Sequence, residues 1–197
     1  MKTQNKTEKE QRMKTHEYDT SLLKFVGDDV LISENVEIKR PHLVTIGNHV
    51  SIDSGFYCTT AIELKDHIHI APYVTIIGGK GGLLKMGNFT NISVGGKIIC
   101  GSDEFLGAGL VTAPGIPDEF RDTLIVKPVI FEDFVNTGAN VVILPGVRLG
   151  EGSVIGACSL VTEDTEPWTI YVGTPARPIK QRPREKMLEY ARKIGYR

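Results

Sequence analysis

The sequence predicts an all-β protein, a parallel β-helix of hexapeptide repeats with an extruded loop and a short C-terminal helix. One observation is a mostly apolar residue at every sixth position, repeated in parallel registers. Another is that Gly and Asn, which tolerate unusual backbone angles, stand between these positions. A strand has a period of 2 and a helix of 3.6, whereas a short strand followed by a corner repeats every six residues. Stacked repeats of this kind bury one continuous core. The repeating positions are Phe131, Thr137, Ile143, Leu149, Ile155 and Val161, with Val129, Val135, Val141 and Val147 beside them, and upstream Ile62, Ile68, Val74, Leu64, Ile70, Ile76, Met86, Ile92 and Ile98.

The chain divides into three parts. Residues 1–29 are a polar tail and a segment that leads into the first coil. Residues 30–172 carry the repeats and form the β-helix domain, and residues 173–197 form a C-terminal tail and helix. Residues 112–127 interrupt the domain, because they are polar, contain Pro and have no period. We expect this stretch to be a loop extruded from the coils, where function is often located.

The C-terminal segment carries a helical pattern. Met187, Leu188, Ala191 and Ile194 are spaced so that they share one face of a helix. The spacing predicts a short amphipathic helix that caps the stack or docks against it.

Composition narrows the class of protein. The chain has 197 residues, is 41% hydrophobic and carries a net charge of −1, so nothing favours nucleic acid or an acidic membrane as a partner. No apolar run is long enough to span a bilayer, and the N-terminus has no signal-peptide pattern. Three cysteines at wide spacing suit reduced thiols, with Cys158 expected as a small buried residue. We therefore expect a cytoplasmic protein.

Several C-terminal motifs carry a resemblance to a known family. The segment over residues 142–180 contains LPGV, then IGACSLVT, then VGTPARPIK. Together these motifs resemble the C-terminal coils of the hexapeptide-repeat acyltransferases, a resemblance that extends over roughly residues 30 to 185. It implies a left-handed β-helix, a homotrimer, and acetyl-CoA or another acyl-CoA as co-substrate in the cleft between neighbouring subunits.

A second segment is similar to one branch of that family. FTNISVGGKIICGSDEFLGAGL, followed by GIPDEF, resembles N-acyltransferases of nucleotide-linked amino sugars, including anthrose-pathway enzymes that act on dTDP-4-amino-4,6-dideoxyglucose. The resemblance implies that Ser93 and Asp103 face the sugar amine. Glu104 is the alternative carboxylate, and Asn91 is a second candidate substrate contact. A solvated corner of the β-helix would explain all four residue types equally well.

A missing histidine favours an amine acceptor. Hexapeptide enzymes that acetylate sugar hydroxyls carry a catalytic His in a TAxHP-like motif, whereas residues 112–116 here read TAPGI. A hydroxyl needs a base to become a good nucleophile. A neutral amine has an available lone pair and needs mainly positioning. A carboxylate could hold it and accept a hydrogen bond as charge develops on nitrogen.

The resemblance also implies a path for the acyl donor. Ala139, Ala157 and Thr162 match positions where CoA lies along the coils, and a pantetheine arm needs small side chains there. Arg177 and Lys180 match the basic pair that meets CoA phosphates, a task that suits the Arg fork and the Lys point charge. Ordinary small corner residues and a solvated tail are the alternatives.

Other polar and aromatic residues remain open. In the loop, Phe120 could stack on a base and Arg121 could meet a diphosphate, or the loop could simply cover a coil. His67 and His69 alternate, so on a strand both would face one side. That suggests zinc, a polar outer face, or a sugar or nucleotide contact. Without a third ligand in register, no metal is expected.

The sequence therefore predicts an N-acyltransferase, most simply an N-acetyltransferase, that moves an acyl group from acyl-CoA to the amine of a nucleotide-linked amino-deoxy sugar in surface-glycan biosynthesis. A sugar O-acetyltransferase of the maltose or galactoside type is the alternative, which the missing His disfavours. A γ-type carbonic anhydrase needs a three-His pattern that the five histidines lack. A non-catalytic β-helix assembly module is the alternative from another class.

Overall fold

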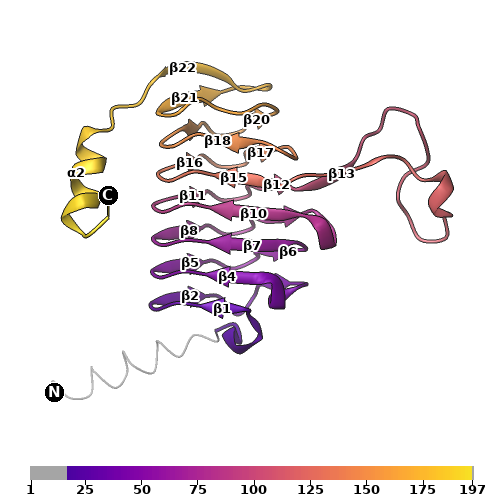
Figure 1. Cartoon of the computed structure of the whole chain (residues 1–197), viewed down its shortest axis with the longest axis horizontal. Helices are drawn as coiled ribbons and strands as arrows, with labels where there is room; N and C mark the ends of the chain where they lie inside the picture. The colour runs from indigo at the N-terminus through magenta and orange to yellow at the C-terminus, as the bar shows by residue number, and fades with distance from the viewer. Residues whose placement is uncertain (1–16, 197) are drawn as a thin grey trace.

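Short parallel strands wind into the predicted β-helix, whose stacked coils form three flat faces (Figure 1). The computed structural model describes residues 17–196, so the expected polar tail lies mostly outside the described residues. Face 1 contains β1 (Phe25–Val26), β4 (Val44–Ile46), β7 (Ala61–Leu64), β10 (Leu83–Met86), β15 (Val129–Phe131) and β18 (Arg148–Leu149). Face 2 contains β2 (Val30–Ile32), β5 (Val50–Ile52), β8 (Ile68–Ile70), β11 (Asn91–Ile92), β16 (Asn136–Thr137), β19 (Val154–Ile155) and β21 (Thr169–Val172), and ends with the antiparallel β22 (Arg177–Gln181). Face 3 contains β3 (Glu37–Ile38), β6 (Tyr57–Cys58), β9 (Thr75–Ile77), β12 (Lys97–Ile99), β17 (Val142–Ile143) and β20 (Leu160–Val161).

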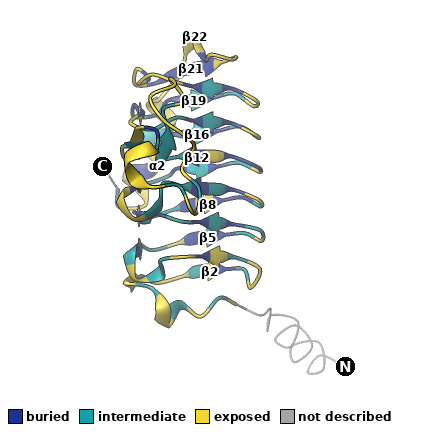
Figure 2. Cartoon of the chain, turned by 90° about the vertical axis from the view of Figure 1, so that its right-hand side faces the viewer, coloured by how far each residue is buried: buried dark blue, intermediate teal, exposed yellow. Residues whose placement is uncertain are grey.

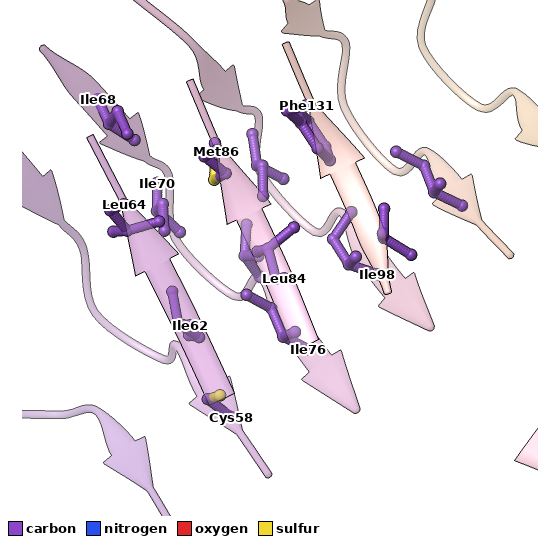
Figure 3. Packing of buried hydrophobic residues seen from close by; sticks show 14 of the residues in the cluster. Cys58, Ile62, Leu64, Ile68, Ile70, Ile76, Leu84, Met86, Ile98 and Phe131 are labelled. Atoms are coloured by element: carbon purple, nitrogen blue, oxygen red, sulfur yellow. The ribbon is translucent and has the colours of Figure 1, made fainter. Parts of the chain in front are cut away.

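The core consists of the predicted repeat positions, all of which are buried. Leu84, for example, lies in register with Ile62 on one side and Val129 on the other, so like positions stack from coil to coil (Figure 3). Full burial of such a side chain is worth roughly 1.5–3 kcal/mol. Stacking starts earlier than residue 30, because β1 already pairs with β4.

We number the three corners of each coil by the faces that they join. At the corner between faces 1 and 2 the backbone turns through the left-handed region at His49, His67, Phe89, Phe134 and Trp168. Their rings form a ladder, with centroids 4.7, 4.9, 5.1 and 5.7 Å apart in that order. His67 therefore belongs to this corner and not to a strand, so the expectation that it shares a strand face with His69 is wrong.

The predicted C-terminal helix is α2 (Glu185–Lys193), and it docks beside the coils rather than on the last one (Figures 1 and 2). Ala191 is buried, and Met187 and Leu188 pack with it against the corner that carries the ring ladder. Ile194 is 59% exposed, because the helix ends at Lys193 and the chain turns away there. The predicted apolar face is thus correct for three of its four residues.

The extruded segment leaves from the corner between faces 3 and 1. It begins with an antiparallel hairpin of β13 (Gly101–Asp103) and β14 (Leu124–Val126), which projects from the stack (Figure 1). The predicted loop over residues 112–127 was therefore too short at its start. Local period alone could not show this, because the departure is set by the pairing of Gly101 with Val126 across the hairpin. Short 3-10 turns complete the irregular parts: η1 (Thr20–Leu22), η2 (Pro41–Leu43), η3 (Gly79–Gly81) and η4 (Asp118–Phe120).

The cysteines differ from one another in their surroundings. Cys58 and Cys100 are buried, and burial raises the pKa of their thiols to about 12 and about 11. Cys158 is exposed, so the expectation that it is buried is wrong. Its backbone adopts the left-handed conformation at the corner between faces 2 and 3, which points the side chain away from the core.

Candidate active site

The corner between faces 2 and 3 gathers three of the predicted site residues in consecutive coils. Ser93 and Val94 occupy one coil, Ala139 the next and Ala157 the one after. The amide of Asn140 donates to the Val94 carbonyl at 2.9 Å, and the amide of Cys158 donates to the Ala139 carbonyl at 2.8 Å. Val94 and the candidate CoA contacts Ala139 and Ala157 therefore occupy the same corner position in three successive coils, and the candidate substrate contact Ser93 lies one residue before Val94.

Small residues are required along this line. A Cβ atom built on Gly138 would lie 2.5 Å from the backbone nitrogen of Ala157, so only glycine fits there without a backbone shift. Ala157 is exposed and Ala139 is half-buried. The result is a shallow track of backbone and methyl groups, open to an extended molecule.

Asn91 and Ser93 are fixed by the neighbouring coil. The amide of Ser93 donates to Oγ1 of Thr137 at 3.2 Å, and Nδ2 of Asn91 donates to Oγ of Ser93 at 3.2 Å. Oδ1 of Asn91 also accepts from the amide of Thr137 at 3.3 Å. Asn91 thus holds the coils together, and the Ser93 hydroxyl still has its own hydrogen to donate.

Asp103 lies at the opposite edge of face 3, on β13 of the hairpin. Its carboxylate accepts hydrogen bonds from the amide of Thr112 at 2.9 Å and from the Thr112 hydroxyl at 2.8 Å. These bonds lower the pKa of Asp103, the backbone bond contributing most. The group is therefore an anion at neutral pH and a weak base. The amide of Glu104 donates to the Thr123 carbonyl at 2.9 Å.

Two loop residues stand farther out on the hairpin. Phe120 is exposed. Arg121 is already engaged, because its Nη1 lies 2.6 Å from Oδ1 of Asp118 and its Nε donates to the Ile116 carbonyl at 2.9 Å. Binding of a diphosphate by Arg121 would require the ion pair with Asp118 to open.

The last predicted residues lie at the C-terminal end of the stack. Thr162 is exposed at the corner between faces 3 and 1, the corner that also carries the hairpin. Nη1 of Arg177 lies 4.0 Å from Oε2 of its neighbour Glu163. Lys180 is exposed on β22, opposite Ile170.

Apart from Arg177 and Lys180 on β22, the predicted residues form two groups on one chain. Asn91, Ser93, Ala139 and Ala157 lie at or beside the corner between faces 2 and 3. The second group, which lies at the corner between faces 3 and 1 or on its hairpin, contains Asp103, Glu104, Phe120, Arg121 and Thr162. Face 3 separates the two groups within the chain.

A separate hollow lies elsewhere on the chain. It measures about 930 Å³ between the end of the chain and face 1, with Lys85, Phe131 and Tyr196 in its lining, and none of the predicted site residues line it. Among residues 17–196, no cluster of three or more His, Cys, Asp or Glu side chains is arranged to hold a metal ion. No helix in this part of the chain is long and apolar enough to cross a membrane.

Comparisons with known proteins settle the family. The bacterial transferase hexapeptide (six repeats) family matches residues 128–163. A dTDP-4-amino-4,6-dideoxy-D-glucose acyltransferase from Escherichia coli is 36% identical over 171 residues, which cover 84% of this chain and 85% of that protein. The chain belongs to the hexapeptide-repeat acyltransferases. The family predicted from its sequence motifs is thereby confirmed.

Two solved structures resemble this acyltransferase along most of its length. Both are of AntD, an N-acyltransferase from Bacillus cereus. The complex with dTDP and 3-hydroxybutyryl-CoA has a TM-score of 0.83 and 34% identity, and covers 90% of this chain and 95% of AntD. A serine-to-alanine mutant in complex with dTDP-4-amino-4,6-dideoxyglucose and coenzyme A has a TM-score of 0.82 and 32% identity, and covers 95% of each chain.

Sequence reasoning missed two features at or near the candidate site residues. Thr112, which lowers the pKa of Asp103, lies nine residues away in an aperiodic loop, and no local pattern signals the pairing. The second feature is a hydrogen bond in which Nε2 of His69 lies 2.8 Å from Oδ2 of Asp53, near the Ser93 corner. This contact could not be predicted from the sequence, because the coil boundaries that bring the two residues together were not known.

Proposed function

We propose that this chain is an acyl-CoA-dependent N-acyltransferase that acylates the amine of a nucleotide-linked amino-deoxy sugar. The Escherichia coli relative is a dTDP-4-amino-4,6-dideoxy-D-glucose acyltransferase, and AntD is solved with dTDP and with CoA species, which favours dTDP as the carrier. AntD has also been solved with one serine or one aspartate substituted, and those two positions are ten residues apart in its chain. Ser93 and Asp103 have the same separation.

The observation that carries the proposal is the line from Ala157 through Ala139 to the corner that Ser93 and Val94 form. An acyl-CoA laid along it from the C-terminal end would place Arg177 near its phosphates. The pantetheine arm would pass the small residues, and the thioester would reach the coil of Ser93. The donor and the acceptor amine would thereby meet at one height in the stack.

We also propose that the working unit is a homotrimer. Ser93 lies at one corner of the coil and Asp103 at another, with face 3 between them. A site that needs both residues is completed when the hairpin corner of one copy meets the Ser93 corner of the next. Three copies around a common axis satisfy this requirement at every interface.

In the proposed mechanism the amine attacks the thioester carbonyl and the C–N bond forms. The C–S bond breaks, and CoA leaves as a thiolate that takes up the proton lost by the amine nitrogen. Asp103 is held as an anion by Thr112, so it serves to hold the amine and to stabilise positive charge that develops on nitrogen. The Ser93 hydroxyl orients the sugar. A backbone amide of the corner would stabilise the oxyanion.

The proposed donor and acceptor are both intracellular metabolites, which supports a cytoplasmic location. An amino-deoxy sugar acylated on its nucleotide carrier is a building block for surface glycans. The proposed role is therefore in surface-glycan biosynthesis, before glycosyl transfer.

The test is a coupled thiol-release assay with acetyl-CoA and 3-hydroxybutyryl-CoA as donors and dTDP-4-amino-4,6-dideoxyglucose as acceptor. Parallel reactions use the same sugar with a hydroxyl in place of the amine. We expect thiol release with the amine only, and an acyl-amide product by mass spectrometry. Release with the hydroxyl sugar alone would instead identify an O-acyltransferase.

The oligomer is tested separately by light scattering at micromolar concentration. A trimer is expected, and a catalytically active monomer would contradict the shared site. Thermal shift with acetyl-CoA distinguishes an enzyme from a non-catalytic module, because a ligand that binds the folded state raises its melting temperature.

A further inference from the structure

We propose that the Asp53–His69 pair and Tyr73 form the subsite for the sugar-nucleotide body of the acceptor, below Ser93 on the same corner. This inference rests on the proposed function. In the proposed function the acyl-CoA lies along the coils from the C-terminal end down to Ser93. The acceptor must therefore extend from Ser93 toward the N-terminal coils. The next two coils at that corner carry residues 71–73 and 53–55.

The first of the two coils continues the corner that carries Ser93. Ala71 follows Ser93 along the corner, and its amide donates to the Ile92 carbonyl at 2.9 Å. Its side chain is only a methyl group and is buried, so no bulky side chain stands between Ser93 and Asp53 along the corner. The amide of Asp53 donates to the Ile70 carbonyl at 2.9 Å in the same way, so the line of residues is unbroken.

Asp53 and His69 supply the polar groups at the end of this line of residues. Nε2 of His69 lies 2.8 Å from Oδ2 of Asp53, and Oγ of Ser51 lies 3.4 Å from Oδ1 of Asp53. The His69 side chain is 54% exposed and the Asp53 side chain 34%. The Asp53 carboxylate accepts hydrogen bonds, and the second ring nitrogen of His69 can make another. Together they suit a ligand with hydroxyl groups. Hydroxyl-rich ribose or pyranose is therefore the expected ligand chemistry.

The surface beside the pair is hollowed. A shallow groove of about 400 Å³ crosses the outer side of face 2. Ser51, His69 and Asn91 belong to its lining, and so do Asp29 and His49 at the corner between faces 1 and 2. Asn91 is the residue that bonds Ser93 and is in register with His69 on the neighbouring strand. His69 of the pair and Asn91, which bonds Ser93, therefore border the same groove.

Tyr73 adds a flat apolar surface. It is 68% exposed and adopts the left-handed backbone conformation, with φ of 60°, which is unfavourable for a bulky residue. At the equivalent corner position the coils on either side carry Gly55 and Gly95, and the Tyr73 ring lies over Gly55. The aromatic residues of the other corner stack on one another, whereas Tyr73 is flanked by glycines. An exposed ring in this setting suits stacking with a base or with the apolar face of a sugar.

The chain contains a matched control for the ion pair. Nδ1 of His49 lies 2.9 Å from Oδ2 of Asp29, and both side chains are exposed. This second Asp–His pair lies at the corner between faces 1 and 2, across the groove from the corner that carries Ser93. Identical substitutions at the two pairs therefore change the same chemistry in two places. A change in sugar-nucleotide binding on substitution of this second pair would place the ligand across face 2 and overturn the assignment to the Asp53 corner.

The experiment measures steady-state kinetics with acetyl-CoA and dTDP-4-amino-4,6-dideoxyglucose, and calorimetric binding of the sugar nucleotide alone. His69→Gln and Asp53→Asn should each raise KM and Kd for the sugar nucleotide by about tenfold, the effect of losing one charge-assisted hydrogen bond. KM for acetyl-CoA should not change. His49→Gln and Asp29→Asn should leave both constants at the wild-type value.

Tyr73→Ala should raise Kd for the sugar nucleotide and for dTDP alone while the protein stays a trimer by light scattering. Loss of the trimer with an unchanged Kd would instead place Tyr73 in a subunit contact. That result would overturn the role of Tyr73 in the subsite. If wild-type enzyme transfers acyl groups and the His69 and Asp53 variants keep its constants, the subsite is wrong and the function stands. If no transfer occurs and acetyl-CoA does not bind, the proposed function fails. The calorimetry then still tests the subsite. Sugar-nucleotide binding that is absent in the wild type, or that is unchanged in the His69 and Asp53 variants, overturns the subsite.

Discussion

The Tyr196 hydroxyl donates a 2.8 Å hydrogen bond to Oδ2 of Asp66, although the two residues lie 130 positions apart in the sequence. The Tyr196 ring also meets the rings of His67 and Phe89 edge-on, at 5.0 and 4.9 Å between centroids. The end of the chain is thereby fixed at the middle of the stack. The C-terminal helix is held at both ends, by β22 and by Tyr196.

Tyr196→Phe should loosen this attachment while keeping the ring contacts. Loss of one hydrogen bond to a partly exposed carboxylate should cost about 1 kcal/mol, mainly in local opening of the helix. Faster tryptic cleavage at Arg192 and Lys193 would report it. Tyr190→Phe is the control, because Tyr190 is exposed on the same helix, and it should cleave at the wild-type rate. Equal rates for both variants would contradict the role of the bond.

The same bond sets two pH limits on helix docking. Burial opposes ionisation of Asp66, but hydrogen bonds from Asn48 and Tyr196 outweigh it and lower its pKa, whereas the bond to Asp66 raises the pKa of Tyr196. A carboxyl with a lowered pKa stabilises the fold above its unfolded pKa of about 4 and loses that contribution as pH falls through the folded value. A phenol with a raised pKa stabilises below about pH 10 and loses its contribution as pH rises through the higher folded value.

Docking should therefore be constant between about pH 5 and 9 and weaken on either side. Trp168, the only tryptophan, packs in the same cluster as α2 and reports docking by its fluorescence. In Tyr196→Phe both transitions should lose amplitude. An alkaline transition unchanged by the substitution would assign it to another group.

Asp103→Asn should reduce kcat for the amino sugar by roughly 10²-fold with the fold intact. The carboxylate beside the amine also raises the amine pKa, so the rise of rate with pH should move to lower pH in the variant. Thr112→Val removes one hydrogen bond from Asp103 but keeps the charge, so its kcat should lie between the two. A fully active Asp103→Asn and an inactive Glu104→Gln would transfer the role to the neighbouring acid.

Arg177→Ala combined with Lys180→Ala should raise KM for acyl-CoA and leave KM for the sugar nearly unchanged. Each charge-assisted phosphate contact is worth about 1.5–3 kcal/mol before solvent screening, and less at these exposed positions. Glu163→Gln is the control. It removes the carboxylate 4.0 Å from Arg177, so KM for acyl-CoA should stay equal or fall. An unchanged KM in the double variant would show that the basic tail does not bind CoA.

Gly152→Ala should destabilise the protein by about 1–3 kcal/mol beyond the usual cost of its backbone conformation. A Cβ atom at Gly152 would lie 2.4 Å from the ring of Trp168. Gly79→Ala is matched to it, because Gly79 has nearly the same positive φ, 62° against 67°, and a Cβ there meets nothing within 4 Å. The difference in urea unfolding free energy between the two variants isolates the Trp168 contact. Equal losses would mean that backbone strain alone explains them.

The sequence predicted what a local period can carry. Ile98 and Phe131 were predicted to lie in the core because the six-residue repeat marks inward-facing positions, and both are buried. Ser93 and Ala139 were chosen from motifs, and they lie along one corner. Features that join distant segments were missed, such as the hairpin start at Gly101 and the bond from Tyr196. A six-residue period does not predict such pairings. It also does not predict which corner side chain points outward, as that of Cys158 does.

The side-docked helix changes how the stack is expected to come apart. An array of repeats in contact only with their neighbours can fray one coil at a time from either end. Here Nη1 of Arg182 donates to the carbonyls of Phe134 and Gly152, at 2.8 and 2.9 Å, and Tyr196 reaches back to Asp66. The final coil cannot peel away without releasing contacts several coils below it. The C-terminal segment therefore links coils that are not neighbours and couples half the solenoid into one cooperative unfolding unit. Removing the last residues of the chain would abolish this cooperativity while leaving every coil in place.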